Sequence, residues 1–152
     1  MEVVRHVVWD IVGGFIPITS ELHWRPEDPA AVHAVFNDHK AGPTPWVFAR
    51  ATLTQAMSSG HGGAGDVVAS RGGMVVKGGQ PFLCEDRFGD KFWIYLSSPS
   101  GLCVLACQAQ QIAVFLEQTF SQVPNGHEEE CYLDGFDEEI EAVLGELQSE
   151  RV

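Results

Sequence analysis

Trp46-Val-Phe-Ala-Arg50 and Leu96-Ser-Ser-Pro-Ser-Gly101 are the two stretches that decide the fold. Each stands at the end of an apolar run rich in bulky, β-prone residues. Trp46-Val47-Phe48 leads into a helix-prone segment, residues 49–58. Residues 92–96 form a predicted strand that a Ser-Ser-Pro-Ser-Gly turn closes, and residues 102–107 return as the next strand. Both stretches predict elements of the protein's structural framework, and neither contains a catalytic motif.

The rest of the chain alternates β-prone runs with turn signals and then becomes helical. We expect strands over residues 2–12, 15–24, 30–36, 46–48, 66–71, 74–77, 91–96 and 102–107, and helices over residues 49–58, 108–123 and 133–147. The pieces between them are expected to be turns or irregular segments, namely residues 13–14, 25–29, 37–45, 60–65, 72–73 and 78–87. This order predicts a single α+β domain, residues 1–152, with antiparallel β-sheets on which the helices pack.

Composition and charge exclude several classes of function. The net charge is −12, and ten of the 21 acids lie between Glu128 and Glu150, where no base accompanies them. The nine Lys and Arg residues are scattered, whereas phosphate binding needs clustered cations, so nucleic acid is a poor partner. No apolar run approaches the roughly 20 residues that a membrane-spanning helix requires. A secretory signal is also missing from the first residues, and we expect a cytoplasmic protein without membrane insertion.

The candidate catalytic and metal-binding patterns are weak. Gly60–Gly65 lacks the Gly-Lys-Ser/Thr ending of a phosphate loop and is interpreted as a flexible connection. His6, His23 and His33 could converge across a sheet, but no histidine pair has metal-ligand spacing. Ser97 and Ser98 lack the GxSxG elbow of a nucleophile and fit a hairpin turn better. We therefore expect no enzyme activity, no cofactor and no metal.

Five short motifs then occur in one order along the chain. They are Trp24–Phe36, which contains Asp28-Pro-Ala-Ala-Val-His-Ala-Val-Phe36; Trp46–Arg50; Gly65-Asp-Val67; Leu96–Gly101; and Phe115-Leu-Glu-Gln-Thr119 with Val123-Pro124. Together they resemble the SsgA-like family of sporulation and cell-division regulators from filamentous spore-forming bacteria. The resemblance runs from about Leu22 to Leu147. Its motif positions are Asp28, Pro29, Trp46, Arg50, Asp66, Ser97, Ser98, Pro99 and Gly101.

The resemblance implies a fold and a function. The implied fold is similar to that of the Whirly and mitochondrial guide-RNA-binding proteins and forms an oligomer, a trimer by that similarity. The implied function is that of a non-enzymatic adaptor at division septa, which recruits the tubulin-like protein FtsZ or controls septal peptidoglycan and spore maturation. The implied partners are FtsZ or a paralogue of this family. The alternative that the Whirly-like fold leaves open is single-stranded nucleic-acid binding, which needs a cationic groove beside stacking aromatic rings.

The acidic end of the chain is a candidate partner surface. In the helix predicted over residues 133–147, an apolar stripe would pack on the protein's own sheet and leave acids outward. Glu138, Glu139 and Glu141 are the outward positions that we expect to meet a basic partner. A rim of exposed acids speeds association more than it adds affinity. Solubility alone is the other explanation of this charge.

Overall fold

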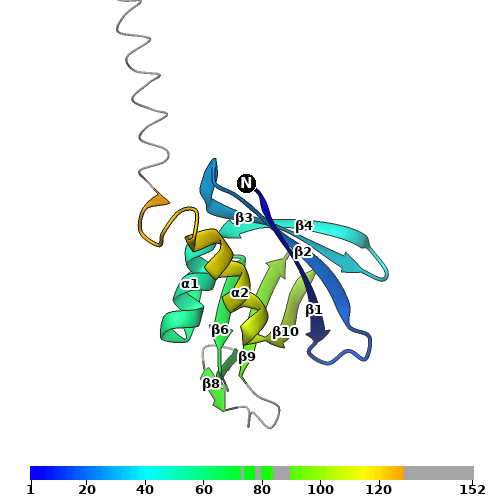
Figure 1. Cartoon of the computed structure of the whole chain (residues 1–152). Helices are drawn as coiled ribbons and strands as arrows, with labels where there is room; N and C mark the ends of the chain where they lie inside the picture. Colours follow the sequence, from blue (N-terminus) through cyan, green and yellow to red (C-terminus); the bar gives the residue numbers. More distant parts are fainter. Residues whose placement is uncertain (73, 78–79, 84–89, 129–152) are drawn as a thin grey trace, which may run out of the picture.

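The computed structural model describes residues 1–72, 74–77, 80–83 and 90–128 (Figure 1). Within these ranges the chain forms strands and two helices in an α+β arrangement. The strands are β1 (Val3–Ile11), β2 (Ile18–Arg25), β3 (Asp28–Asp38), β4 (Gly42–Ala49), β5 (His61–Ala64), β6 (Val67–Arg71), β7 (Met74–Lys77), β8 (Gln80–Leu83), β9 (Lys91–Ser98) and β10 (Gly101–Gln108). The helices are α1 (Arg50–Ser59) and α2 (Ala109–Phe120).

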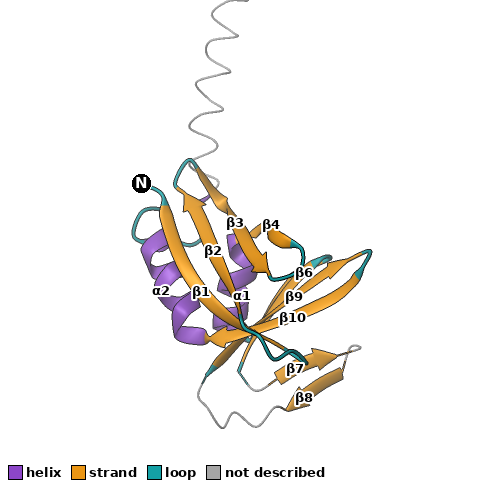
Figure 2. Cartoon of the chain, turned by 90° about the vertical axis from the view of Figure 1, so that its right-hand side faces the viewer, coloured by secondary structure: helices purple, strands orange, loops and turns teal. Residues whose placement is uncertain are grey.

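Eight of the strands form one antiparallel sheet in the order β4-β3-β2-β1-β10-β9-β6-β5, and β7 and β8 form a separate hairpin. The sheet bends at β1. This strand pairs with β2 along Val3–Trp9, but its ladder with β10 contains only the pairs of Asp10 and Ile11. The two halves, β4-β3-β2-β1 and β10-β9-β6-β5, therefore diverge, and they open on the side opposite α1 and α2 (Figure 2).

The core lies between the two halves and the helices. As predicted, Ile18, Ser20, Leu22 and Trp24 fall on one side of β2, and all four are buried. Trp9 is also buried, and its indole N–H donates to the Ser20 hydroxyl at 2.7 Å. Because Trp9 and Trp24 are almost fully enclosed, neither ring is available to stack on a nucleic-acid base.

Several predicted boundaries were wrong. Gly60–Gly65, expected to be a flexible connection, contains strand β5, which pairs with β6. Residues 37–45, expected to be a turn, include the first part of β4, because pairing with β3 extends back to Gly42. β8 lies in the segment expected to be irregular. In α1 the predicted apolar face is shifted: Ala49 precedes the helix and is exposed, whereas Arg50 is buried. The helix predicted over residues 133–147 lies outside the described residues.

The edge strands β4 and β5 are poor templates for a further strand. β4 contains Pro43 and Pro45, which have no N–H to donate, and proline in a sheet is confined to edges of this kind. β5 is four residues long and contains Gly62, whose missing side chain is a packing requirement. A Cβ at Gly62 would lie 2.3 Å from the Thr52 carbonyl oxygen of α1. The glycine therefore lets β5 approach the helix.

Candidate functional site

A groove lies between the β3–β4 hairpin and the β9–β10 hairpin, where the two halves of the sheet diverge. Its volume is about 320 Å³. Buried apolar side chains from β2, β3, β9 and β10 form its floor, namely Ile18, Phe36, Leu96 and Leu105. Trp46 of β4 lines one wall, Leu102 and Cys103 at the start of β10 line the other, and polar turn residues complete the rim. We call this the hairpin groove.

The hairpin groove brings together motif positions that are far apart in the sequence. Trp46, half-buried on β4, lines it together with Ser98 and Gly101 of the β9–β10 turn. Pro99 is exposed in the same turn, and Ser97 precedes it. The two stretches that decide the fold therefore meet at one surface. An apolar floor with a polar rim is the arrangement that protein interfaces commonly have.

Ser97 and Ser98 stand at the β9–β10 hairpin turn, as predicted. Ser98 pairs with Gly101 across the hairpin, and its hydroxyl lies 2.8 Å from the Ser100 hydroxyl. Gly101 has a φ of +133°, which a side chain would strain. Ser97 donates its backbone N–H to the Asp66 carbonyl oxygen at 2.8 Å. This contact involves the backbone of Asp66, and the Asp66 side chain is exposed at the β5–β6 turn.

Arg50 lies elsewhere, buried at the start of α1. Its guanidinium lies over the rings of Trp24 and Phe120, 5.5 and 4.8 Å from the ring centroids. It donates to the Val123 carbonyl at 2.8 Å and to the Glu128 carboxylate at 2.6 Å. Cation–π contact and charge-assisted hydrogen bonds together hold the first turn of α1 to the segment after α2. Arg50 is an internal anchor and offers nothing to an external ligand.

Asp28 and Pro29 stand at the β2–β3 turn, next to Trp24, over whose ring Arg50 lies. Pro29 is buried at the start of β3, and its carbonyl oxygen accepts the indole N–H of Trp24 at 2.9 Å. Asp28 is exposed, and its carboxylate lies 3.9 Å from the His33 ring. The motif that contains these residues therefore fixes the β2–β3 turn against Trp24, on which Arg50 lies.

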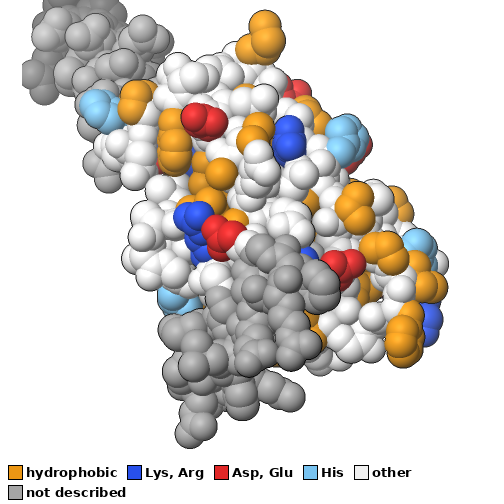
Figure 3. Space-filling view, turned by 60° about the horizontal axis from the view of Figure 1, so that its bottom comes forward, with side chains coloured by type: hydrophobic (Ala, Val, Ile, Leu, Met, Phe, Trp, Pro, Cys, Tyr) orange, Lys and Arg blue, Asp and Glu red, His pale blue; other side chains and the backbone are white. Residues whose placement is uncertain are grey.

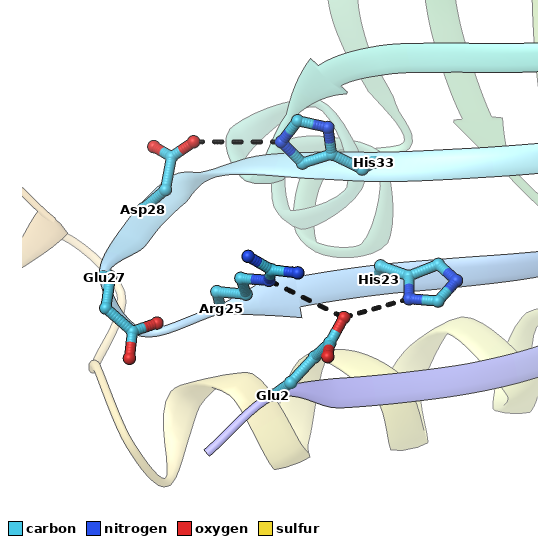
Figure 4. Close-up of a pocket in the computed structure, with 6 residues that line it drawn as sticks. All are labelled: Glu2, His23, Arg25, Glu27, Asp28 and His33. Carbon is cyan, nitrogen blue, oxygen red and sulfur yellow. Dashed lines mark hydrogen bonds and ion pairs between the residues drawn. The ribbon is translucent and has the colours of Figure 1, made fainter.

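A second, polar hollow of about 420 Å³ lies on the outer face of β1, β2 and β3 (Figure 4). Glu2 lies between His23, at 3.1 Å, and Arg25, at 3.7 Å. The hydrogen bond with His23 and the charge of Arg25 hold the pKa of Glu2 below its ordinary value. His33 lies directly across the ladder from His23.

The three histidines weighed as metal ligands have carboxylates as neighbours on this face. His6, His23 and His33 do share the outer face of the sheet, but carboxylates are their neighbours: His6 and His23 face Glu21 at 3.8 and 3.2 Å. Within the described ranges no group of three or more metal-ligating side chains could hold a metal ion. The face is a network of exposed ion pairs, which contributes little stability.

The thiols within the described ranges are not activated. Burial raises the pKa of Cys107 to about 12. Partial desolvation in the hairpin groove, with the nearby Asp38 carboxylate, raises the pKa of Cys103, although the residue as a whole is exposed. A thiolate is the nucleophilic form of cysteine, and these environments oppose it.

The remaining predicted positions and elements fall outside these sites. Glu138, Glu139 and Glu141 are not among the residues that the structure describes. No described helix is both long and apolar enough to cross a bilayer.

The floor residues of the hairpin groove were not predicted as a site from the sequence. Alternation of apolar residues identifies Phe36 and Leu105 as inward-facing, but the opening above them depends on the bend at β1.

Comparison with known proteins gives consistent results for most of the chain. Residues 18–128 match the family model described as "Streptomyces sporulation and cell division protein, SsgA". The chain is 35% identical over 113 residues to the sporulation-specific cell division protein SsgB of Saccharopolyspora erythraea, which covers 74% of this chain and 70% of that protein. It is 32% identical over 131 residues to SsgB of Streptomyces coelicolor, covering 86% and 85% of the two chains.

Solved structures agree with the sequence matches. An SsgA-like sporulation-specific cell division protein from Thermobifida fusca superposes with a TM-score of 0.73 at 26% identity, covering 93% of this chain and 95% of that chain. A structure from work on SsgB mutations and longitudinal cell division in Streptomyces coelicolor gives a TM-score of 0.68 at 28% identity, covering 86% and 95%. The predicted α+β fold, with helices on antiparallel strands as in the Whirly-like proteins, is confirmed.

Proposed function

We propose an adaptor function for this chain, which belongs to the SsgA family of sporulation and cell division proteins. The family is non-enzymatic, so the chain acts through what it binds. In this proposal the chain works in the cytoplasm at division septa, where it docks a protein of the septation machinery. The names of its relatives, sporulation-specific cell division proteins, support the process, and the partner is our inference.

One observation carries the docking proposal: the hairpin groove collects Trp46, Ser98 and Gly101 around an apolar floor. Leu102, at the same groove, is 60% exposed. Aromatic and aliphatic groups beside a polar rim are the usual centre of a protein interface, where a few buried contacts supply most of the affinity. The arrangement supports the groove as the surface through which a partner is bound.

FtsZ is the partner that we place first, and a paralogue of this family is the second. Recruitment of FtsZ to the septum and control of septal peptidoglycan or spore maturation remain the two tasks that such docking could serve. The acidic positions Glu138, Glu139 and Glu141 would assist by steering a basic partner, since charges outside an interface act mainly on the association rate.

The proposal is tested by measuring the affinity of the full chain for purified FtsZ, and for a paralogue, from the same bacterium. Ser98→Glu places a charge on the rim of the groove and should weaken binding by about tenfold or more, the loss expected when a central interface contact is broken. Gln118→Glu adds the same charge at an exposed position of α2 and serves as the control. Equal affinities of the two variants and the wild type would place the docking surface elsewhere.

A further inference from the structure

The first residues of β10 extend past the end of β1, and no described strand lies beside them on that side. The last contact between these two strands is the hydrogen bond from the Val12 N–H to the Val104 carbonyl, at 3.0 Å. After Ile11 the chain turns away, and a hydrogen bond from the Gly14 N–H to the Ile11 carbonyl closes this turn at 3.0 Å. Gly101, Leu102 and Cys103 therefore extend past their neighbour, and all three are exposed.

The direction of the free backbone groups follows from strand geometry. In a strand the N–H and C=O of successive residues alternate between its two sides. Because the Val104 carbonyl faces β1, the Leu102 N–H and C=O face the same way. The pairing with β9 supports this direction for Leu102. Ser97 of β9, opposite Leu102, directs its N–H away from β10, to Asp66 of the β5–β6 turn. Within the described ranges no strand occupies this edge at Leu102.

This open edge borders the hairpin groove. Leu102 and Cys103 are among its lining residues, beside the buried floor. The opposite wall is β4, from which Thr44 and Trp46 line the groove. The groove thus has, in β10, a wall that can form backbone hydrogen bonds beside an apolar floor. An extended chain against β10 satisfies both features of the site, since alternate side chains of a strand point to opposite faces.

We propose that the hairpin groove binds an extended segment of the protein partner, which adds to β10 at Leu102 as a short strand and inserts an apolar side chain between Cys103 and Trp46, since Cys103 shares the groove face of β10 with Leu105. This inference rests on the proposed docking function and specifies its mode. Main-chain hydrogen bonds supply affinity in such strand addition, and the pocket for the inserted side chain supplies specificity. The segment is expected to carry a β-branched or aromatic residue flanked by residues with free N–H groups.

Two substitutions at Leu102 separate the contribution of its backbone N–H to binding from the contribution of its side chain. Leu102→Pro removes the N–H that faces outward and leaves the ladder with β9 intact. Leu102→Ala keeps the N–H and shortens the side chain. With purified FtsZ as the probe, we expect Leu102→Pro to lower the affinity at least fivefold more than Leu102→Ala. Circular dichroism and the thermal midpoint establish that both variants are folded.

Amide hydrogen exchange of the wild-type chain supplies a second measurement that needs no variant. Exchange at the Leu102 N–H should slow at least tenfold when FtsZ is bound, whereas exchange at Val47, an exposed residue of β4, should not change.

Equal affinity of both variants for FtsZ, together with no protection of the Leu102 N–H, would overturn the extended binding mode and leave the docking function standing. Failure of the wild type to bind FtsZ or a paralogue would overturn both. If Leu102→Pro instead dissociates an oligomer of this chain, the edge belongs to a second copy and the inference is wrong.

Discussion

Arg50 shows how one residue ties together parts of the chain that are distant in sequence. Its side chain is fully buried, and its acceptors lie at Thr119, Val123, Pro124 and Glu128. The sequence identifies Arg50 only as a motif position, and a charged residue in a motif is ordinarily read as functional. Charged side chains are almost never fully enclosed unless they are paired, and no local pattern reveals the pairing. The structural role could not have been predicted from the sequence.

Replacing Arg50 by Met should therefore cost stability. The variant keeps an apolar group between Trp24 and Phe120 but leaves the partly buried Glu128 carboxylate without its partner. Breaking a buried pair in this way lowers the free energy of unfolding by about 3 kcal/mol. The matched control is Arg25→Met, because Arg25 is 68% exposed and its ion pair with Glu2 is long; a change of under about 1 kcal/mol is expected there. Equal losses in urea unfolding would contradict the anchor role.

The same pair predicts a pH dependence. Burial alone would raise the pKa of Glu128, but the Arg50 hydrogen bond and charge, with backbone donors, outweigh it, so the pKa lies below its ordinary value of 4.5. A lowered pKa stabilises the folded state above the ordinary value, and the stabilisation is lost as the pH falls through the lowered one. The difference in unfolding free energy between wild type and Glu128→Gln should shrink from pH 7 to pH 3. A difference independent of pH would show that the ion pair contributes nothing.

Elements were predicted well where alternation of apolar residues is clear and poorly where glycine or proline dominates. β2 has the buried face that its sequence indicates, and α2 buries Ile112, Phe115 and Leu116 as its periodicity predicts. Glycine-rich β5 gave no such signal, because its order comes from contact with α1. The hairpin groove was not predictable either, since the register of Asp10 with Ala106 sets the bend.

Gly62 tests the contact between β5 and α1. A Cβ there would meet the backbone of α1 at 2.3 and 2.9 Å, distances that force the strand or the helix to move. We expect Gly62→Ala to destabilise the protein by about 3 kcal/mol, as overpacking against backbone does. Gly65→Ala is the control, because nothing lies within 4 Å of its Cβ and only its φ of +74° opposes the change, at a cost of about 1–2 kcal/mol. Denaturant midpoints that shift equally would refute the close-packing argument.

At the scale of the whole molecule, exposed apolar side chains predict self-association. Phe15 is fully exposed, and Val12 and Ile16 beside it are more than half exposed. Hydrophobic side chains gather on the side where the β1–β2 and β3–β4 turns lie (Figure 3). Such patches mark interfaces. We expect a homo-oligomer, a trimer by the family resemblance, when light scattering is coupled to size exclusion. Phe15→Ser should weaken it, and a monomer at micromolar wild-type concentration would contradict the expectation.

Net charge at this scale continues to oppose the nucleic-acid alternative. Eleven of the 21 acids and eight of the nine Lys and Arg residues lie in residues 1–127, so this part alone has a net charge of −3. Its most deeply buried cation, Arg50, is used internally. A single-stranded nucleic acid needs a cationic path along its backbone. The protein-docking account therefore remains the one that the surface supports.

Site-specific photocrosslinking in sporulating cells tests that account most directly. A photoreactive amino acid at position 98 reports contacts of the hairpin groove, and one at position 118 reports contacts of α2 as the control. The account predicts that position 98 crosslinks to FtsZ or to a paralogue of this family, and that position 118 does not. Crosslinks to a septal protein from position 118 alone, or from position 98 only to a second copy of this chain, would contradict docking through the groove.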